Sequence, residues 1–255
     1  HVLQNYPIRH AYLSDVNAEI ILVYQTIQQR LGSLLEALQE YQARYDFMSE
    51  SSRRDYFYEI RKSYNEKKAA VYLPFSEACI ERAAHIIFLN KTCFNGLFRF
   101  NHKGEFNAPF GRYVKPRILN AENLKRVSGI LQSVELKTAD FEMMNERPDY
   151  QHSFVYLDPP YRPLSSTARF TAYCTQTFGD PEQCQLAKLF QVLHAKGAKL
   201  MLSNSDPRNN DEADSFFDDL YAGFTISRVP CSRRINCVAG KRGQINEIVI
   251  TNYEV

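Results

Sequence analysis

The chain has 255 residues, of which 44% are hydrophobic and 24% charged, and its 31 Lys and Arg against 29 Asp and Glu leave a net charge of +2. This composition is typical of a globular protein with a large core, as one domain or a domain with an insertion. No apolar run approaches the roughly 20 residues that a membrane span needs, and no secretory signal pattern opens the chain. The six cysteines form no CxxC pair and no Cys/His metal spacing, so we expect reduced cytosolic thiols and no bound metal.

The first part of the chain is predicted to be mostly helical. Residues 8–13 predict a short strand that ends at Ser14-Asp15, and Asn17 then caps a helix to about Arg30, with a buried side that includes Tyr24. Further helices are predicted over residues 34–45, 47–68 and 76–89, the last with Ser76 as its cap.

Residues 94–117 are rich in Gly, Asn and Phe without a period, which predicts a loop or an irregular hairpin. From Lys91 to Arg117 there are six Lys or Arg and one acid, Glu105. From Arg228 to Arg242 there are five Lys or Arg and no acid. Two basic segments in a near-neutral protein fit a nucleic-acid groove, although either could equally be a solvated loop.

Strands and helices alternate in the rest of the chain. Gly179-Asp180-Pro181-Glu182 predicts a helix start, with Asp180 as the cap and Pro181 first, and a helix to about Ala195. This alternation predicts an α/β fold with a mainly parallel sheet, and the last two strands predict an antiparallel hairpin at its edge. The predicted strands cover residues 133–137, 154–157, 198–202, 224–229 and 245–252, and a second helix covers residues 211–221.

The most informative pattern is Asp158-Pro159-Pro160-Tyr161, which directly follows the apolar run 154–157. Two prolines cannot continue a ladder, and their fixed φ makes a stiff turn at the carboxyl end of a strand, where open α/β sheets bind ligands. A carboxylate and backbone carbonyls only accept hydrogen bonds, so they suit an amino group that must be held and made nucleophilic. The aromatic ring beside them can stack on a planar base. A Pro-rich turn without chemistry fits these four residues equally well.

Longer segments resemble the Dam-type DNA adenine-N6 methyltransferases, which modify adenine in 5′-GATC-3′. The similarity is most specific at residues 95–101 and 104–113, which look like the target-recognition region of that family, and it runs from about Asp15 to the carboxyl terminus. Other similar segments are Leu13-Ser14-Asp15-Val16-Asn17, Ala139-Asp140-Phe141-Glu142, Asp158-Pro159-Pro160-Tyr161 with Pro163-Leu164-Ser165, and Phe170-Thr171-Ala172-Tyr173. The resemblance implies a Rossmann-like methyltransferase sheet, with residues 1–32 and 130–255 as the catalytic domain and residues 33–129 as an inserted, mostly helical DNA-recognition domain.

The resemblance also implies S-adenosylmethionine as the cofactor, bound by Asp15, Asp140, Phe141 and Asp158. Asp15 matches the carboxylate that binds the ribose hydroxyls, with simple helix capping as the alternative, and Asp140 with Phe141 would lie beside the cofactor adenine, with an exposed turn as the alternative. The target adenine is flipped out of the duplex because its N6 is otherwise paired. Asp158 and the carbonyl of Pro159 would accept the two N6–H bonds, Pro160 completes the motif, and Tyr161 would stack on the base.

The DNA contacts implied by the resemblance can be ordered by role. Arg99 is the candidate for bidentate contact with guanine O6 and N7, and Pro109 offers an apolar surface to a thymine methyl. Phe94 matches an aromatic side chain that wedges into the duplex. Asn101 and Asn107 could read an adenine edge or hold the loop, Tyr113 could contact phosphate or lock the loop, and Asn95 lies in the same segment. Arg233 and Arg234 are expected to hold the phosphate backbone, and Phe98, Phe100, Phe106 and Phe110 to pack in the core.

One part of the family pattern has no match: a Gly-rich loop that cradles the methionine part of the cofactor. The chain has no GxG pair, so we expect it to lack about one strand and loop of the native protein; a cofactor-deficient fragment is the alternative. The leading hypothesis is a GATC-specific adenine methyltransferase in a bacterial or phage-infected cytoplasm, acting beside a cognate restriction endonuclease without binding it. The alternatives are another acceptor, such as cytosine N4 or a protein amide, and a non-catalytic DNA-binding module.

Overall fold

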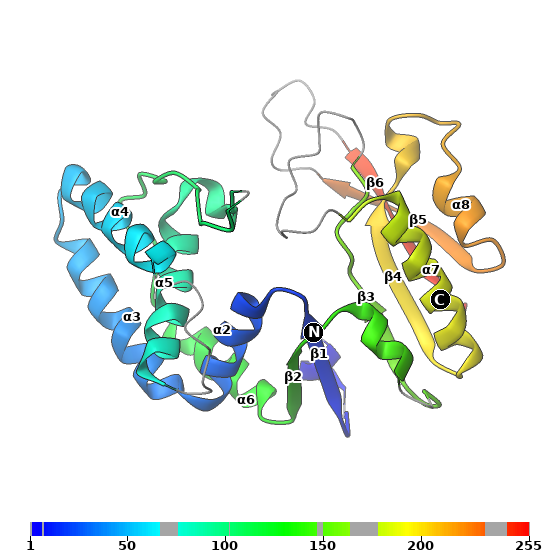
Figure 1. Cartoon of the computed structure of the whole chain (residues 1–255), viewed down its shortest axis with the longest axis horizontal. Coiled ribbons are helices and arrows are strands. Elements are labelled where there is room, and N and C mark those ends of the chain that lie inside the picture. The colour runs from blue at the N-terminus through cyan, green and yellow to red at the C-terminus, as the bar shows by residue number, and fades with distance from the viewer. Residues whose placement is uncertain are drawn as a thin grey trace. The chain divides into compact units, whose positions relative to one another are not determined.

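The computed structural model describes residues 2–6, 8–66, 76–101, 103–146, 150–163, 178–232 and 244–254. These residues form two compact units, the first up to Asp140 and the second from Phe141 onward (Figure 1). Each unit has its own hydrophobic core. No helix in these ranges is both long and apolar enough to cross a membrane.

The first unit is mostly helical. Its core surrounds the central helix α5, which packs against α2, α3 and α4 and is buried on several sides. The ring of Phe88 on α5 lies within 5.4 Å of the rings of Tyr41 and Tyr56. The unit contains α1 Val2–Asn5, β1 Ala11–Asp15, α2 Ala18–Gln29, α3 Leu31–Asp46, α4 Glu50–Glu66, α5 Glu77–Thr92, the 3₁₀ turn η1 Phe94–Gly96, α6 Ala121–Leu131 and β2 Val134–Thr138.

A buried ion pair ties α2 to α5. The Nε of Arg82 donates to the Glu19 carboxylate at 2.8 and 3.0 Å, and the guanidinium lies 4.1 Å from the centre of the Tyr64 ring. Two buried charges are tolerated because the guanidinium and the carboxylate satisfy each other with bidentate hydrogen bonds. The pair therefore fixes the register between α2, which directly follows β1, and the helical core.

Strands β1 and β2 of this unit are parallel and end at the same edge, because Asp15 at the end of β1 is paired with Thr138 at the end of β2. The side chain of Asn17 accepts a hydrogen bond from the Glu19 N–H at 3.0 Å and caps α2, as the sequence predicts. Two parallel strand ends thus lie at the start of a capped helix, which is the geometry of a ligand site in α/β sheets.

The second unit holds a four-stranded sheet in the order β3-β4-β6-β5. Strands β3 and β4 are parallel, and β6 is antiparallel to both β4 and β5. Three strands therefore run in one direction and only β6 is reversed, which confirms a mostly parallel α/β sheet with an antiparallel pair at its edge. The unit contains η2 Phe141–Glu146, β3 Phe154–Leu157, α7 Asp180–Ala195, β4 Lys199–Ser205, η4 Pro207–Asn209, α8 Phe216–Leu220, β5 Thr225–Ser232 and β6 Gln244–Thr251.

Several element predictions need correction. The cap of α7 is Gly179 and not Asp180, because the Glu182 carboxylate accepts from the Gly179 N–H at 2.7 Å and draws that residue into the cap position. The helix predicted over residues 211–221 is only α8, because Asp211 and Asp214 accept from the N–H groups two residues ahead, at 3.0 Å in both cases, and form turns that compete with a helix. Helix α6 was not predicted.

Smaller differences concern burial and capping. Tyr24 is exposed and Leu22 takes its place on the buried side of α2. Ser76 precedes α5 as predicted, but its hydroxyl lies 3.3 Å from the Cys79 sulfur and does not bond a helix N–H. The division into a catalytic domain and a DNA-recognition domain at residues 32/33 and 129/130 stays a prediction, since compact packing does not report which part binds DNA.

Candidate active site and recognition segment

The Asp158-Pro159-Pro160-Tyr161 turn follows β3 directly, at the edge where the parallel strand β4 also ends. The register pairs Leu157 with Leu202, which brings the next residue of β4, Ser203, beside Asp158. The Ser203 hydroxyl donates to Asp158 Oδ1 at 3.1 Å, and the Tyr156 hydroxyl lies 2.8 Å from the same Ser203 oxygen. Because the one proton of Ser203 is directed at Asp158, Tyr156 is the donor of the second bond. The carboxylate is thus held by a two-step hydrogen-bonded chain.

Tyr161 is half-buried next to this carboxylate. Its hydroxyl donates to Glu247 Oε2 of β6 at 3.4 Å. Burial raises the pKa of Tyr161, and the nearby Glu247, Asp158 and Tyr156 raise it further, while a hydrogen bond with Ser203 works in the opposite direction. The phenol therefore stays neutral at physiological pH, and its ring is available for stacking.

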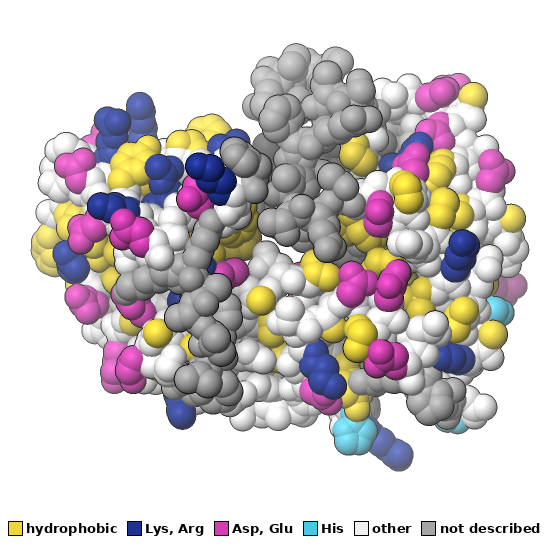
Figure 2. Space-filling model, in the orientation of Figure 1, with side chains coloured by type: hydrophobic (Ala, Val, Ile, Leu, Met, Phe, Trp, Pro, Cys, Tyr) yellow, Lys and Arg dark blue, Asp and Glu magenta, His cyan; other side chains and the backbone are white. Residues whose placement is uncertain are grey.

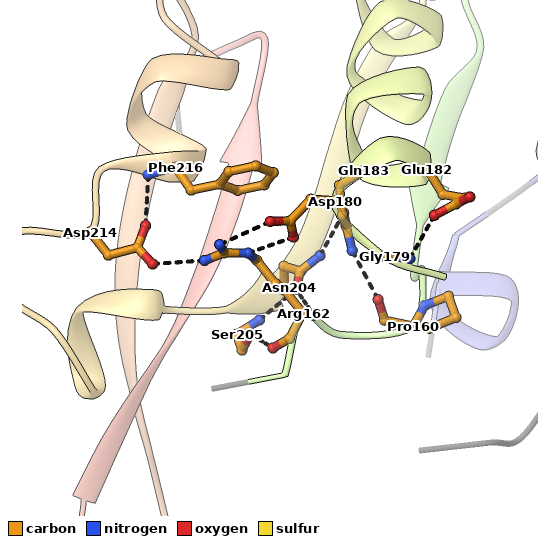
Figure 3. Close-up of polar contacts among 10 residues, drawn as sticks. All are labelled: Pro160, Arg162, Gly179, Asp180, Glu182, Gln183, Asn204, Ser205, Asp214 and Phe216. Carbon is orange, nitrogen blue, oxygen red and sulfur yellow. Dashed lines mark hydrogen bonds and ion pairs between the residues drawn. The ribbon is translucent and has the colours of Figure 1, made fainter. Parts of the chain in front are cut away.

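Arg162 leads the chain out of the turn and is held on two sides (Figure 3). Its Nε lies 2.8 Å from Asp180 and its Nη1 lies 2.7 Å from Asp214, and the guanidinium stacks 4.2 Å from the centre of the Phe216 ring. The hydrogen bond to Asp180 is the main cause that raises the pKa of Arg162. Burial alone would raise the pKa of Asp214, but the hydrogen bonds from Arg162 and the Phe216 N–H outweigh burial and lower it. The arrangement ties the turn to the first residue of α7 and to the segment before α8.

The predicted cofactor-binding carboxylates of the first unit lie at neighbouring strand ends. Asp15 ends β1, and Asp140 lies two residues beyond β2. Asp15 Oδ1 accepts from the Asn17 N–H at 2.7 Å, so Asp15 orients the residue that caps α2 but is not itself the helix cap. Two carboxylates at adjacent parallel strand ends also suit the hydroxyl and amino donors of a nucleoside, because a carboxylate accepts hydrogen bonds on both oxygens. The residues present therefore fit the adenosine part of S-adenosylmethionine.

Phe141 begins the second unit, where its ring meets that of Phe178 edge-on at a centroid distance of 6.0 Å. An apolar ring at this point can cover one face of a flat base. The residues in the described ranges hold no group of three or more His, Cys, Asp or Glu side chains that could bind a metal ion.

The segment after α5 folds into an irregular hairpin. Antiparallel bridges join Cys93 to Phe110 and Phe100 to Phe106. At its tip Asn101 makes the turn, because its side-chain oxygen accepts from the Lys103 and Glu105 N–H groups at 2.9 and 3.0 Å, and its amide donates to the Glu105 carboxylate at 2.8 Å. This geometry favours the loop-holding role of Asn101 over the base-reading role.

Arg99 and Asn107 form a pair on the exposed face of this hairpin. Arg99 Nε donates to Asn107 Oδ1 at 2.8 Å and its Nη2 donates to the Asn107 carbonyl at 3.3 Å. The pair holds the guanidinium plane away from the hairpin core, and an oriented plane is what bidentate contact with a base edge requires. Pro109, also exposed, follows on the same strand.

The phenylalanines of the segment pack inward, as predicted. Phe106 and Phe110 are buried, and Phe98 and Phe100 pack half-buried against the same core. Phe94 is different, because 49% of its surface is exposed. The hairpin thus separates an apolar inner face from an outer face on which Phe94 is half-exposed and Tyr113 is also exposed.

Tyr113 closes the hairpin from both sides. Its hydroxyl accepts from the Asn95 N–H at 3.2 Å, and its carbonyl accepts from the Tyr45 hydroxyl at 2.9 Å. Gly111, two residues before Tyr113, has no room for a side chain, because a Cβ there would come within 2.6 Å of the Cys93 carbonyl oxygen. The loop-locking role of Tyr113 therefore has the required contacts.

All six Lys and Arg residues between positions 91 and 117 are exposed. Figure 2 shows Lys and Arg side chains of the first unit interspersed with acidic ones, so the face in view is mixed in charge. In the second basic segment, Arg228 bonds Asp206 at 3.1 Å and Asp218 at 2.8 Å and is engaged within the fold. Arg233, Arg234, Leu164-Ser165 and Phe170-Thr171-Ala172-Tyr173 lie outside the described residues.

The residues that make hydrogen bonds with the Asp158–Tyr161 turn or its partners were not predicted from the sequence. Tyr156, Ser203 and Glu247 all reach this turn from β3, β4 and β6. One signal was present: the polar run Ser203-Asn204-Ser205-Asp206 directly follows a predicted buried strand, as Asp158 does. Glu247 gave no such signal, because its proximity depends on the pairing of β6 with β4.

Comparisons with known proteins identify the family of the chain. A family model described as D12 class N6 adenine-specific DNA methyltransferase matches residues 1–235. The Type II methyltransferase M.MjaIII of Methanocaldococcus jannaschii is 41% identical, over 99% of this chain and 83% of that protein. The Type II methyltransferase M1.LlaDCHI of Lactococcus lactis subsp. cremoris is 34% identical, over 95% and 79%. The DNA adenine methylase of Escherichia coli K12 is 31% identical, over 93% and 77%. The chain therefore belongs to the D12 class of N6 adenine-specific DNA methyltransferases and is an enzyme of that type.

Proposed function

We propose that this enzyme methylates N6 of adenine in double-stranded 5′-GATC-3′ after flipping the base out of the helix, with Asp158, Pro159 and Tyr161 receiving it. The methyl donor that the family implies, S-adenosylmethionine, supplies an electrophilic carbon on a sulfonium. The observation that carries the proposal is the turn at the end of β3, where the Asp158 carboxylate, held by Ser203 at 3.1 Å, and the Pro159 carbonyl can only accept hydrogen bonds.

Methyl transfer to N6 requires these residues to bind the amino group, to orient its lone pair and to hold the base in place. Asp158 and the Pro159 carbonyl accept hydrogen bonds from the two N6–H groups. These hydrogen bonds draw the lone pair of N6 out of the ring and towards the methyl carbon. With the donor bound, the N6 lone pair would form the new N–C bond while the departing sulfur keeps the electrons of the carbon–sulfur bond as a neutral thioether, and the extra proton on N6 would pass to Asp158 and from there to solvent. Tyr161 holds the ring in place by stacking. Positioning and fixed dipoles supply most of the rate, since a sulfonium needs no strong base to be attacked.

The proposed GATC specificity rests on the hairpin of residues 94–113. Its Arg99–Asn107 pair suits a guanine edge, and Pro109 suits a thymine methyl. Phe94, which is half-exposed, is proposed as the wedge that fills the gap left by the flipped base. For the cofactor, Asp15 and Asp140 are proposed to bind the ribose hydroxyls and the adenine amino group, with Phe141 against the adenine face.

Digestion of methylated plasmid DNA tests target and specificity together. Plasmid without adenine methylation is incubated with the enzyme and S-adenosylmethionine, then cut with two GATC nucleases of opposite methyl sensitivity. The expected result is protection from the nuclease that needs unmethylated sites and cleavage by the one that needs methylated sites. If labelled methyl is incorporated but neither the protection nor the cleavage is seen, GATC is not the target sequence. Base analysis would then separate N6-methyladenine from N4-methylcytosine.

Calorimetric titration with S-adenosylmethionine addresses the non-catalytic alternative. Saturable binding that Asp15→Ala weakens supports the proposed cofactor site, whereas DNA binding without any cofactor binding would favour a recognition module. We further propose a cytoplasmic role as the modification enzyme beside a restriction endonuclease that it does not bind, because two of the relatives bear the name Type II methyltransferase.

A further inference from the structure

The backbone of the Asp158–Tyr161 turn is almost fully determined by its two prolines. Their rings fix φ at Pro159 and Pro160. Asp158 and Pro159 each precede a proline and are therefore confined to extended conformations. The first torsion that the sequence leaves open is ψ of Pro160. This torsion sets the direction of the Pro160 carbonyl and, with it, the direction in which Tyr161 leaves the turn.

A buried glutamine holds that one open torsion. Gln183, in the first turn of α7, has no solvent exposure. Its Nε2 donates to the Pro160 carbonyl at 3.0 Å, and its Oε1 accepts from Asn204 Nδ2 at 3.2 Å (Figure 3). Both polar ends of the side chain are thus used, and one of them fixes the peptide group that precedes Tyr161.

Asn204 holds the peptide group that follows Tyr161. Like Gln183, it has no solvent exposure. Its Oδ1 accepts from the N–H groups of Arg162 and Ser205, at 2.9 Å in both cases, and the Ser205 hydroxyl donates to the Arg162 carbonyl at 2.6 Å. One connected pair of amides therefore grips the chain immediately before and immediately after Tyr161.

Both amides bind backbone groups on either side of Tyr161, in addition to the bonds that Asn204 makes with Gln183 and with the Ser205 N–H. Burying two amides is costly unless their hydrogen bonds are satisfied, and apolar side chains of similar size would fill the same volume without that cost. We propose that Gln183, supported by Asn204, is a positioning residue that fixes Tyr161 in the orientation in which its ring stacks on the target base. This inference rests on the proposed function.

The first test replaces the glutamine by an apolar residue of similar shape. Gln183→Met removes the donor to Pro160, and Gln185→Met, at an exposed position of the same helix, is the matched control. Single-turnover methylation under saturating DNA and cofactor should fall about 10- to 100-fold for Gln183→Met, because small misplacements of reacting groups cost up to about 10²-fold. Binding of DNA and of cofactor should stay within a few fold. An unchanged rate would overturn the proposal.

A double-mutant cycle shows whether Gln183 acts through Tyr161. If it does, Gln183→Met should add little to the defect of Tyr161→Ala, because residues that share one role are not additive. If the rate reductions of the two single variants instead multiply in the double variant, Gln183 supports the fold or another group. That result would overturn the assignment. Melting curves of all variants identify any loss that comes from unfolding.

Gln183→Glu keeps the experiment interpretable if Gln183→Met folds poorly. A glutamic acid side chain can donate to the Pro160 carbonyl only while it is protonated, and burial raises the pKa of such a group. The single-turnover rate of Gln183→Glu, divided by that of wild type at the same pH, should therefore rise as the pH falls. A pH-independent ratio would contradict the proposed donor role.

A fluorescent base separates this inference from the proposed function. With 2-aminopurine at the target adenine, wild-type enzyme should raise the fluorescence, and Gln183→Met should raise it further by loosening Tyr161. If wild type methylates DNA without any rise, base flipping fails, while the cycle of rates still tests the positioning role.

Discussion

Asp158 has one oxygen bonded to Ser203, and no other residue in the described ranges donates to its second oxygen, Oδ2. A substrate amino group can therefore take that position without displacing a protein contact. The Ser203 bond also limits rotation of the carboxylate, so that Oδ2 keeps one direction.

Asp158→Ala should abolish methyl transfer while DNA affinity stays within a few fold. Removing one polar catalytic contact of this kind costs about 10²–10³ in rate, and DNA is held mainly by other residues. Asp158→Asn keeps an acceptor oxygen and should retain more activity than Asp158→Ala. Wild-type single-turnover rates for Asp158→Ala would rule out the mechanism.

Arg99→Ala should reduce selectivity for guanine at one position of the site by about 1–3 kcal/mol. Asn107→Ala should reduce it by less, because it loosens the guanidinium without removing it. The measurement is binding to GATC duplexes and to duplexes substituted at each position. Equal weakening at every site would make Arg99 a backbone contact.

Phe94→Ala should lower both methylation and the 2-aminopurine signal, because without a wedge the helix recloses over the gap. Tyr161→Ala should instead brighten the signal while methylating poorly, since a stacked base is quenched and stacking contributes about 1–3 kcal/mol per base. Unchanged rate and fluorescence in Phe94→Ala would make Phe94 a surface residue without this role.

At the scale of elements, the hairpin of residues 94–113, which is proposed to read DNA, is held by helix α4. Asn65 pairs with both backbone groups of Phe106, accepting from its N–H at 2.8 Å and donating to its carbonyl at 3.1 Å. Arg61 donates to the Ala108 carbonyl at 3.2 Å. Asn107 lies between these two contacts, so α4 fixes the strand that carries the partner of Arg99.

Asn65→Leu should therefore lower discrimination between GATC and single-mismatch duplexes, because leaving the Phe106 backbone groups without partners destabilises this hairpin arrangement by about 1–3 kcal/mol. Binding to non-specific DNA at low salt should hardly change. Asp55→Leu, at an exposed position of α4, is the control. A uniform loss on all DNA would show that Asn65 supports the fold of the unit and not the reading of bases.

The elements that could be predicted from sequence are those with local signals. Asn17 caps α2, and the two prolines end β3, because both effects act within a few residues. Helix α6 had a usable signal as well, with Asn120 accepting from the Asn123 N–H at 3.3 Å and Leu124, Ser128 and Leu131 on one face. The cap of α7 lies one residue before the predicted Asp180, because the Glu182 carboxylate accepts from the Gly179 N–H and the helix already begins at Asp180.

The candidate site was predictable only in part, for the same physical reason. Asp158 and Tyr161 stand in one tetrapeptide, but Ser203 and Glu247 reach them through strand pairing. No local pattern encodes which residue of β6 faces the turn. Gln183 is similarly hidden, because a glutamine in a first helical turn is ordinarily a solvated residue.

At the scale of the whole molecule, charge is distributed unevenly over a near-neutral chain. The Lys and Arg residues of segment 91–117 are exposed, whereas Arg228 of the other segment is engaged with Asp206 and Asp218. The remaining cations of that segment are therefore the ones expected to meet DNA phosphates.

Replacing Arg233 or Arg234 by Ala should weaken binding to all sequences alike and reduce the slope of log affinity against log salt by about 1. Arg228→Met is the contrasting variant, since it should lower the melting temperature and leave the salt slope unchanged. Titrations of GATC and non-GATC duplexes at several salt concentrations measure both effects. A sequence-dependent loss in Arg233→Ala or Arg234→Ala would contradict a phosphate contact.

The two prolines at positions 159 and 160 have a further consequence for the proposed choice of base. Neither has a backbone N–H, so their two peptide positions offer only carbonyl acceptors and no donor to a keto oxygen. Guanine and thymine would each present an oxygen to the carboxylate and carbonyl that await an amino group, and lone pairs would face lone pairs. Under the proposed mechanism a wrongly flipped base would therefore be rejected after it has left the helix, and fidelity would have two stages: reading of the duplex by the hairpin and selection of the single base by the proline turn.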